Sequence, residues 1–373
     1  MVIMALDHVR DYFNSDAFLY APEDLSQTNI AVFFTRFITH FCAPVFVFLA
    51  GTSAFFVSLR RTKKELSIWL IKRGLWLVIL EVTIIKFAWM FQLNYSSVLL
   101  QVIWVLGISM VILAGLIHLP KKFVLTLCLI AIFGHNLFDG ISFTTSGANN
   151  LWTFLHVQNL IPTSNVLWFV GYPIIPWIFL MPLGYYFGNL YLPEIKQSHR
   201  LKRLKQMGIV SIALFFILRT FNVYGNPTDW VFQDSFELTL VSYFNVAKYP
   251  PSLLYLLITL GPSVLLLAYA DQWKDKLAKF LITIGRVPMF YYIIHLFVIH
   301  LLALIAAVLT GFKAEDMVID LWVTMEPGLR GYGFSLGIVY LIWLGIIILL
   351  YPFCKWYDNY KTNNKEKWWL SYL

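Results

Sequence analysis

Residues 39–53 read THFCAPVFVFLAGTS, an apolar stretch that contains one histidine, His40. An imidazole in hydrocarbon is costly unless it faces the protein interior or a water-filled cavity, so an ionisable residue at this place is a candidate functional group. The small residues from Gly51 to Ala54 favour the close approach of a neighbouring helix. The alternative interpretation is a histidine that only packs against another helix.

The composition of the whole chain indicates a membrane protein. Of its 373 residues, 59% are hydrophobic and only 13% are charged, which in a soluble protein would expose too much apolar surface. Ten apolar runs are candidate helices for a bilayer core, which requires about 20 residues. They are Met1–Phe13, Ala31–Leu59, Ser67–Phe91, Ser97–Leu119, Phe123–Ile141, Val166–Tyr191, Met207–Val223, Pro250–Ala270, Phe280–Thr310 and Phe334–Trp356. The sequence therefore predicts an all-α, polytopic transmembrane bundle of ten helices, as a single domain over residues 1–373.

The first run, Met1–Phe13, is short for a membrane helix. It extends about 20 Å at the helical rise, whereas the hydrocarbon core is about 30 Å thick. We therefore expect the first helix to be truncated at its N-terminus in this sequence.

Basic residues are concentrated in alternate loops. One set of loops holds Arg60, Arg61, Lys63, Lys64, Lys121, Lys122, Lys196, Arg200, Lys202, Arg203, Lys205, Lys274, Lys276, Lys279, Lys355, Lys361, Lys365 and Lys367, and the other set holds only Lys248, Lys313 and Arg330. The positive-inside rule places the first set in the cytoplasm, together with both termini and a tail over residues 357–373. The net charge of +8 thus reflects membrane topology, and no nucleic-acid partner is expected.

Polar residues gather in the outer half of this predicted bundle, which indicates one polar cavity that opens outward. A histidine held by a carboxylate is a general base near neutral pH, so carboxylate–imidazole pairs suit proton transfer and acyl transfer. We expect catalytic roles for His40, His8 and Asp7. Substrate-binding roles are expected for Arg10, Glu81, Gln101, His295, His300 and Lys248. No metal is expected, because His295 and His300 are five residues apart and lie on different helix faces.

Two other classes of function stay open. A proton-coupled transporter of a small polar solute would use the same residue types as a relay. A structural or assembly protein would not need so many ionisable groups at one depth. A transporter should show an internal repeat with broken helices at matching positions, and no repeat is found around the prolines of this chain.

Several motifs carry a resemblance that covers nearly the whole chain. They are MALDHVRDYF at 4–13, HFCAPVFVFLAG at 40–51, YPIIPW at 172–177, KYPPSLLY at 248–255, GRVPMFYY at 285–292 and WWLSYL at 368–373. These stretches resemble a bacterial family of membrane proteins related to heparan-α-glucosaminide N-acetyltransferase. Relatives carry an Arg and an Asp-x-x-Arg-Gly segment before the first helix. The catalytic histidine of the eukaryotic enzyme lies in the loop after that helix, whereas residues 14–30 here contain no histidine, so His8 or His40 would have to supply this role.

The resemblance implies a transmembrane O- or N-acetyltransferase in the bacterial inner membrane. Acetyl-CoA would be the cytosolic donor, and a sugar or glycan on the extracytoplasmic side would be the acceptor. The CoA phosphates could be held by Arg60, Arg61, Lys72 and Arg73, although these residues also fit the positive-inside rule alone. The lipid bilayer is the expected environment, and the sequence leaves a homodimer open.

Overall fold

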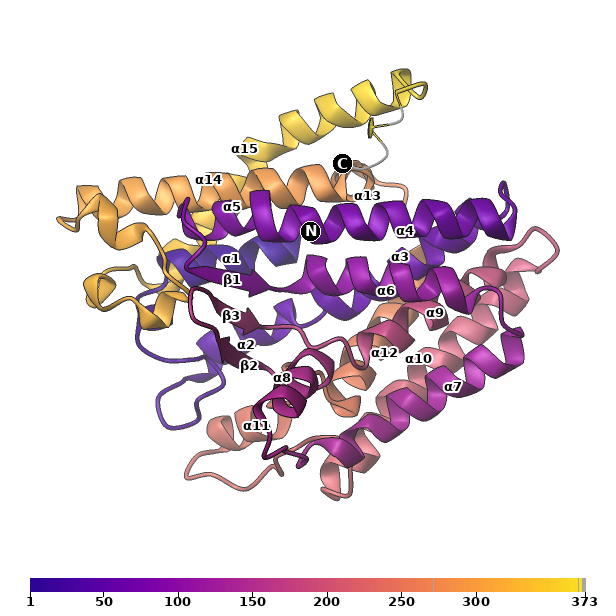
Figure 1. The fold of residues 1–373 in the computed structure, drawn as a ribbon, viewed down its shortest axis with the longest axis horizontal. Helices are drawn as coiled ribbons and strands as arrows, with labels where there is room; N and C mark the ends of the chain where they lie inside the picture. Colours follow the sequence, from indigo (N-terminus) through magenta and orange to yellow (C-terminus); the bar gives the residue numbers. More distant parts are fainter. Residues whose placement is uncertain (271, 368, 371–373) are drawn as a thin grey trace. The chain divides into compact units, whose positions relative to one another are not determined.

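Helices dominate the computed structural model, which describes residues 1–270, 272–367 and 369–370. Within these residues, five helical segments are long and apolar enough to cross a membrane. They are Ile30–Ser58, Lys121–Phe138, Leu253–Ala270, Pro288–Leu309 and Leu336–Asn363, and Val102–Leu116 is a shorter apolar helix. The predicted class, a multi-pass bundle of apolar helices, is therefore confirmed (Figure 1).

The chain divides into two compact units, each built from separate stretches of sequence. The first comprises Met1–Cys42, Thr83–Ser97 and Trp273–Leu373, and the second Ala43–Val82 and Val98–Gln272. The first unit contains α1 (Val2–Phe13), η1 (Ser15–Phe18), α2 (Ile30–Thr39), α5 (Lys86–Met90), α13 (Lys276–Arg286), α14 (Pro288–Leu309), η5 (Ala314–Met317), η6 (Val323–Met325), η7 (Pro327–Leu329) and α15 (Leu336–Asn363).

The short helix α1 lies in the core of the first unit. Every residue from Met4 to Phe13 is buried, because α1 packs against α2, α14 and α15. The indole N–H of Trp343 in α15 donates to the carbonyl of Val2 at 2.9 Å. The buried stretch includes ionisable residues as well as apolar ones, so α1 carries several charged side chains into the interior.

The second unit contains most of the remaining elements. They are α3 (Cys42–Ser58), α4 (Lys63–Leu80), the π-helical turn η2 (Glu81–Ile85) at its boundary, β1 (Ser97–Leu100), α6 (Val102–Leu116), α7 (Lys121–Gly134), η3 (His135–Phe138), α8 (Ser146–Leu155), β2 (Asn159–Pro162), β3 (Leu167–Val170), α9 (Trp177–Phe187), η4 (Gly188–Tyr191), α10 (Gln197–Thr220), α11 (Phe236–Phe244) and α12 (Leu253–Ala270). Helices α10 and α12 lie side by side, as do α4 and α6 (Figure 1).

Glycines allow two of these helices to touch through their backbones. A Cβ at Gly184 of α9 would lie 1.9 Å from the carbonyl oxygen of Phe48 in α3, and one at Gly51 would lie 2.0 Å from that of Met181. No side chain larger than hydrogen fits at such distances, which is the small-residue packing common in membrane bundles. The close helix approach predicted at Gly51 is confirmed.

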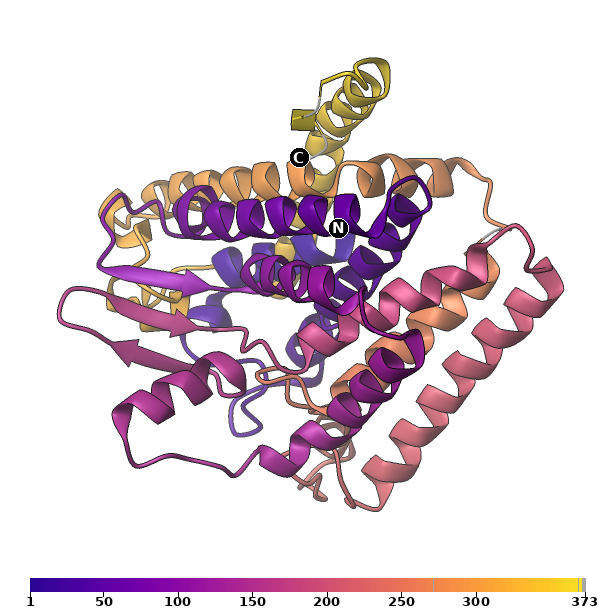
Figure 2. The ribbon, with the colours of Figure 1, turned by 45° about the vertical axis from the view of Figure 1, so that its right-hand side comes forward.

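A small sheet replaces helix at two places. Its strand order is β1–β3–β2, and β2 pairs antiparallel with β3, with Asn159 opposite Val170 (Figure 2). The helices predicted over 97–119 and 166–191 are therefore shorter, since α6 begins at Val102 and α9 at Trp177. Pro173 and Pro176 explain the second difference, because proline breaks the helical hydrogen-bond ladder and disfavours helix in the residue before it.

Proline also interrupts two long apolar runs. In the run 31–59, α2 ends at Thr39 and α3 begins at Cys42. Pro44 has no N–H to donate to the carbonyl of His40, so the ladder cannot continue there. In the run 280–310, α13 ends before Pro288, which starts α14. His40 thus lies at a break between two helices rather than within one.

The C-terminal helix is longer than predicted. The apolar run ends at Trp356, whereas α15 continues to Asn363 and so includes the start of the predicted tail 357–373. The prediction for the end of that tail, at 368 and 371–373, lies outside the described residues.

Candidate functional site

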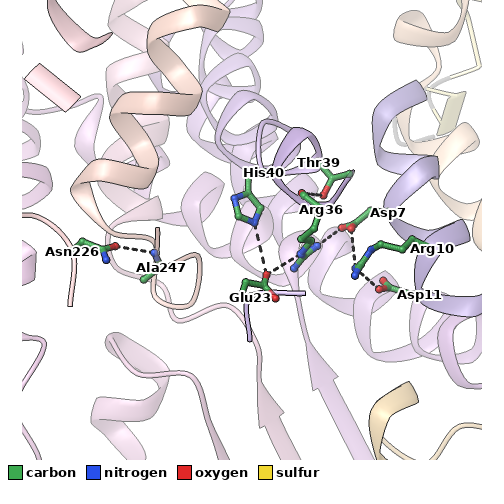
Figure 3. Close-up of polar contacts among 9 residues, drawn as sticks. All are labelled: Asp7, Arg10, Asp11, Glu23, Arg36, Thr39, His40, Asn226 and Ala247. Carbon is green, nitrogen blue, oxygen red and sulfur yellow. Dashed lines mark hydrogen bonds and ion pairs between the residues drawn. The ribbon is translucent and has the colours of Figure 1, made fainter. Parts of the chain in front are cut away.

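A cluster of charged side chains lies in the interior of the first unit (Figure 3). It joins α1, α2 and the loop between η1 and α2, and is hereafter the acid–base cluster. Its members are Asp7, Arg10, Asp11, Glu23, Arg36 and His40. Arg36 is central, because Nη1 lies 2.5 Å from Asp7 Oδ2 and Nε lies 3.0 Å from Glu23 Oε1.

The two ends of the cluster are formed by Arg10 and His40. Arg10 Nη2 lies 3.2 Å from Asp7 Oδ1 and 2.6 Å from Asp11 Oδ1. His40 Nε2 lies 3.9 Å from Glu23 Oε1. The carboxylate beside His40 is therefore Glu23, whereas Asp7, which the sequence suggested for this position, contacts the two arginines.

Local helix geometry explains why these residues meet. Asp7 and Arg10 are three residues apart on α1, and Arg36 and His40 are four apart at the end of α2, so each pair shares a helix face. The start of α2 is fixed by Asn29, whose side chain accepts a hydrogen bond from the backbone N–H of Val32 at 3.0 Å, as N-cap residues do.

The cluster is buried except at Glu23. The His40 side chain is 1% exposed and that of Glu23 is 31% exposed, so Glu23 is the most exposed side chain of the cluster. Burial alone would raise the pKa of the Glu23 carboxyl, but Arg36, His40 and Arg10 lower it by more, and the net shift of the pKa is downward. Glu23 is therefore held as a carboxylate beside His40.

The charges of the cluster nearly cancel. Three carboxylates face two guanidinium groups, which leaves one negative charge while the imidazole is neutral. A proton on His40 would balance that charge.

Two other predicted residues, His8 and His295, form an aromatic group in the same unit. Their ring centroids are 5.2 Å apart, and the ring of His8 is 4.7 Å from that of Trp89. His295 Nδ1 donates to the carbonyl of Tyr291 at 2.8 Å. This tautomer leaves the basic lone pair of a neutral imidazole on His295 Nε2, which has no hydrogen-bond partner among the residues that the structure describes.

His300 is held by the backbone. Its Nε2 lies 2.7 Å from the carbonyl oxygen of Met317 and its Nδ1 lies 3.1 Å from that of Ala88. The ring stacks on Phe91, with centroids 3.9 Å apart. Contacts of this kind on both ring nitrogens and on the ring face fix the residue in place.

The second unit contains the other predicted substrate-binding residues, Glu81, Gln101 and Lys248. Glu81 accepts hydrogen bonds from the backbone N–H groups of Gln101 at 2.8 Å and Trp104 at 3.2 Å. Gln101 directly precedes α6 and Trp104 lies in its first turn, where a carboxylate satisfies free donors and complements the helix dipole. Lys248 lies in the loop before α12, with its Nζ 5.1 Å from the ring centre of Tyr249.

The residues predicted for the CoA phosphates lie on and before α4. Arg60 and Arg61 occupy the turn between α3 and α4, and Lys72 and Arg73 belong to α4. The guanidinium groups of Arg61 and Arg73 both face the ring of Trp69, at 5.9 and 5.4 Å from its centroid. The fold thus gathers part of this basic set around one indole.

Sequence reasoning missed Glu23 and Arg36 as members of the site. Arg36 had a signal, since it is an ionisable residue in the same apolar run as His40 and one helical turn before it. Glu23 had none beyond its charge, because a loop pattern does not show which side chain turns inward.

Comparison with known proteins gives one family. The family described as "Heparan-alpha-glucosaminide N-acetyltransferase, catalytic" matches residues 1–224. No curated protein and no solved structure matches the chain. The matched residues include the whole acid–base cluster and the basic set of Arg60, Arg61, Lys72 and Arg73, whereas Lys248, His295 and His300 lie beyond them.

Proposed function

Since this chain belongs to the heparan-alpha-glucosaminide N-acetyltransferase catalytic family, we propose that it moves an acetyl group from cytosolic acetyl-CoA to a sugar on the other side of the membrane. Membership of this family indicates an acetyltransferase, and the five candidate spans among the described residues indicate a multi-pass membrane protein. The identity of the donor, the sugar acceptor, and the place of the chain in a bacterial inner membrane are parts of the proposal.

One observation carries the proposal. A buried histidine, His40, lies beside a carboxylate at a break in an apolar segment long enough to span a bilayer. Ionisable groups in such segments are expensive and mark functional sites. The helix break supports the same reading, since irregular backbone at membrane depth is tolerated where it is covered by protein or lines a cavity.

In the proposed chemistry His40 is the general base and Glu23 orients it. With hydrogen on Nε2, directed toward Glu23, the basic lone pair of the imidazole lies on Nδ1. His40 then accepts the proton of the acceptor amine or hydroxyl at Nδ1 and returns it to the leaving group. Arg36 holds Glu23 in position, so it is a positioning residue rather than a catalytic one.

Acetyl-CoA supplies an activated acyl group, and its phosphates need cations. This requirement is met by Arg60, Arg61, Lys72 and Arg73. A guanidinium group binds two phosphate oxygens through parallel hydrogen bonds, and the ammonium group of Lys72 binds phosphate as a point charge. Two of these cations already converge on Trp69. We place this basic set and both chain termini on the cytoplasmic side. The bias of Lys and Arg toward one set of loops supports this orientation.

An activity measurement tests the proposal. The purified chain is reconstituted in liposomes and given acetyl-CoA with a labelled acetyl group, with amino sugars and neutral sugars as acceptors. Transfer of the label to a sugar supports the proposal. Absence of transfer, together with proton-driven uptake of the sugar, would refute the acetyltransferase proposal and favour the proton-coupled transporter.

A pair of variants tests the donor site in the same assay. Arg61→Gln with Arg73→Gln should raise KM for acetyl-CoA and leave kcat nearly unchanged, because it removes binding that is equal in the ground and transition states. Lys313→Gln, at an exposed cation outside the basic set, is the matched control and should leave KM unchanged.

A further inference from the structure

Three metal-ligating side chains converge near the end of α7, within the second unit. His135 begins η3, Asp139 follows η3, and His156 follows α8. One nitrogen or oxygen atom from each of the three lies within 4.8 Å of the others. They are hereafter the His-His-Asp cluster, and they are separate from the acid–base cluster of the first unit.

The imidazoles of this cluster are buried without adequate partners. His135 is 3% exposed, and among the described residues neither of its ring nitrogens has a hydrogen-bond partner. His156 is fully buried, with Nε2 3.0 Å from Asp139 Oδ1, and its Nδ1 also has no partner within the described part of the chain. A histidine–aspartate hydrogen bond therefore satisfies only one of four buried ring nitrogens, and burial of the rest is costly.

The carboxylate is oriented by a second layer of contacts. Asn136 donates from Nδ2 to Asp139 Oδ2 at 2.8 Å. The Oδ1 of Asn136 accepts the backbone N–H of Leu253 at 2.8 Å, which anchors it to the start of α12. Asp139 thus keeps Oδ1 directed at His156, and hydrogen bonds of this kind to a ligating carboxylate are typical of metal sites.

We propose that His135, Asp139 and His156 bind a divalent transition metal of the Zn²⁺ type. Imidazole and carboxylate suit Zn²⁺, and bonds of about 2.0–2.2 Å in a tetrahedral site put ligand atoms about 3.3 Å apart. The contact between His156 and Asp139, at 3.0 Å, is already close to that separation. Since the ligand atoms lie within 4.8 Å of one another, a movement of at most about 1.5 Å would bring the most distant one to that separation.

The expected site has three protein ligands and one open position. Two neutral imidazoles and one carboxylate would leave a single positive charge on the bound ion. The side chain of Asp139 is 18% exposed whereas that of His156 is 1% exposed, so the open position faces outward past the carboxylate. Water or an oxygen of a small ligand can occupy such a position.

The sequence did not predict this site. The expectation of no metal rested on the spacing of His295 and His300 along one helix. The ligands found here come from two elements, and His156 follows Asp139 by 17 residues, a spacing that fits no short motif.

Zinc binding by the purified chain tests the proposal. The protein carries an affinity tag without histidine, is stripped with a chelator, and is titrated with Zn²⁺ in competition with a zinc-binding dye. We expect one Zn²⁺ per chain and a higher melting temperature with the metal. Asn136→Ala should weaken binding about 10- to 100-fold, the usual effect of losing a second-layer contact.

Variants of the ligands decide the result. The double variant His135→Ala with His156→Ala should lose stoichiometric binding, while His118→Ala, at an exposed histidine bonded to Ser67, should bind Zn²⁺ as the unaltered chain does. If the double variant does not fold, the isosteric substitution Asp139→Asn tests the site instead. We expect Asp139→Asn to bind Zn²⁺ at least about tenfold more weakly than the unaltered chain. The proposal would be overturned if the unaltered chain showed no stoichiometric binding of Zn²⁺. It would also be overturned if the affinity for Zn²⁺ were unchanged in the His135→Ala, His156→Ala double variant or in Asp139→Asn. Neither outcome depends on acetyl transfer.

Discussion

The substitution Arg36→Gln tests the structural basis of the acid–base cluster. Removal of one partner from a buried ion pair costs about 3–5 kcal/mol, because the other charge stays buried. The Asp7 side chain is 11% exposed and that of Glu23 is 31% exposed, so Asp7 bears most of this cost, and the screened contact to Glu23 adds little. Arg10 still contacts Asp7, which favours the lower end of the range. We therefore expect a loss of about 3 kcal/mol in the free energy of unfolding.

The assay is the melting temperature of the purified protein in detergent. An unfolding entropy of about 2.1 cal/mol/K per residue converts this loss into a decrease of about 4 °C for 373 residues. The double variant Asp7→Asn with Arg36→Gln should be more stable than the sum of the single effects predicts, since the two residues are in direct contact. Lys313→Gln breaks an exposed ion pair, the 3.2 Å contact with Glu315, and should change little. A melting temperature of Arg36→Gln equal to that of Lys313→Gln would refute the reasoning.

Two further predictions concern pH and topology. Because the pKa of Glu23 in the folded protein lies below its ordinary value of 4.5, its charge stabilises the fold above that pH, and this contribution is lost on acidification. The melting temperature should therefore fall more steeply below pH 4.5 in the unaltered chain than in Glu23→Gln; parallel curves would contradict this. Single cysteines placed in residues 142–165 should react with an impermeant thiol reagent on intact cells, whereas labelling only within 196–205 would reverse the proposed topology.

Composition and hydrophobic runs were enough to predict a multi-pass helical bundle, because the length and apolarity of a membrane helix are local properties of the sequence. The interruptions were harder to place. Pro44 and Pro173 carry the physical reason for the breaks at His40 and before α9, yet the same residues are also tolerated inside membrane helices. The π-helical turn at Glu81 had no such marker. The organisation of the chain as a single domain over 1–373 stays a prediction.

The members of the candidate site were predictable where the sequence of a single apolar segment identifies them. His40 was found as an ionisable residue in an apolar run, and Arg36 could have been found by the same argument. The position of Glu23 depends on a loop, and the meeting of His156 with His135 depends on two elements that only the fold brings together. Pairings between distant residues follow from tertiary packing, which periodicity along one chain does not encode.

The central claim is that His40 is the general base of acetyl transfer. The direct measurement is the rate of transfer from labelled acetyl-CoA to a sugar by His40→Ala and His40→Asn, each shown to insert and to purify as a monodisperse species, with His118→Ala as the control. Loss of a general base lowers the rate about a hundredfold to ten-thousandfold, so we predict a decrease of this size in both His40 variants and none in the control. A folded His40→Ala that transfers acetyl groups at the rate of the unaltered chain would contradict the account and move the assignment to His8, with His295 next.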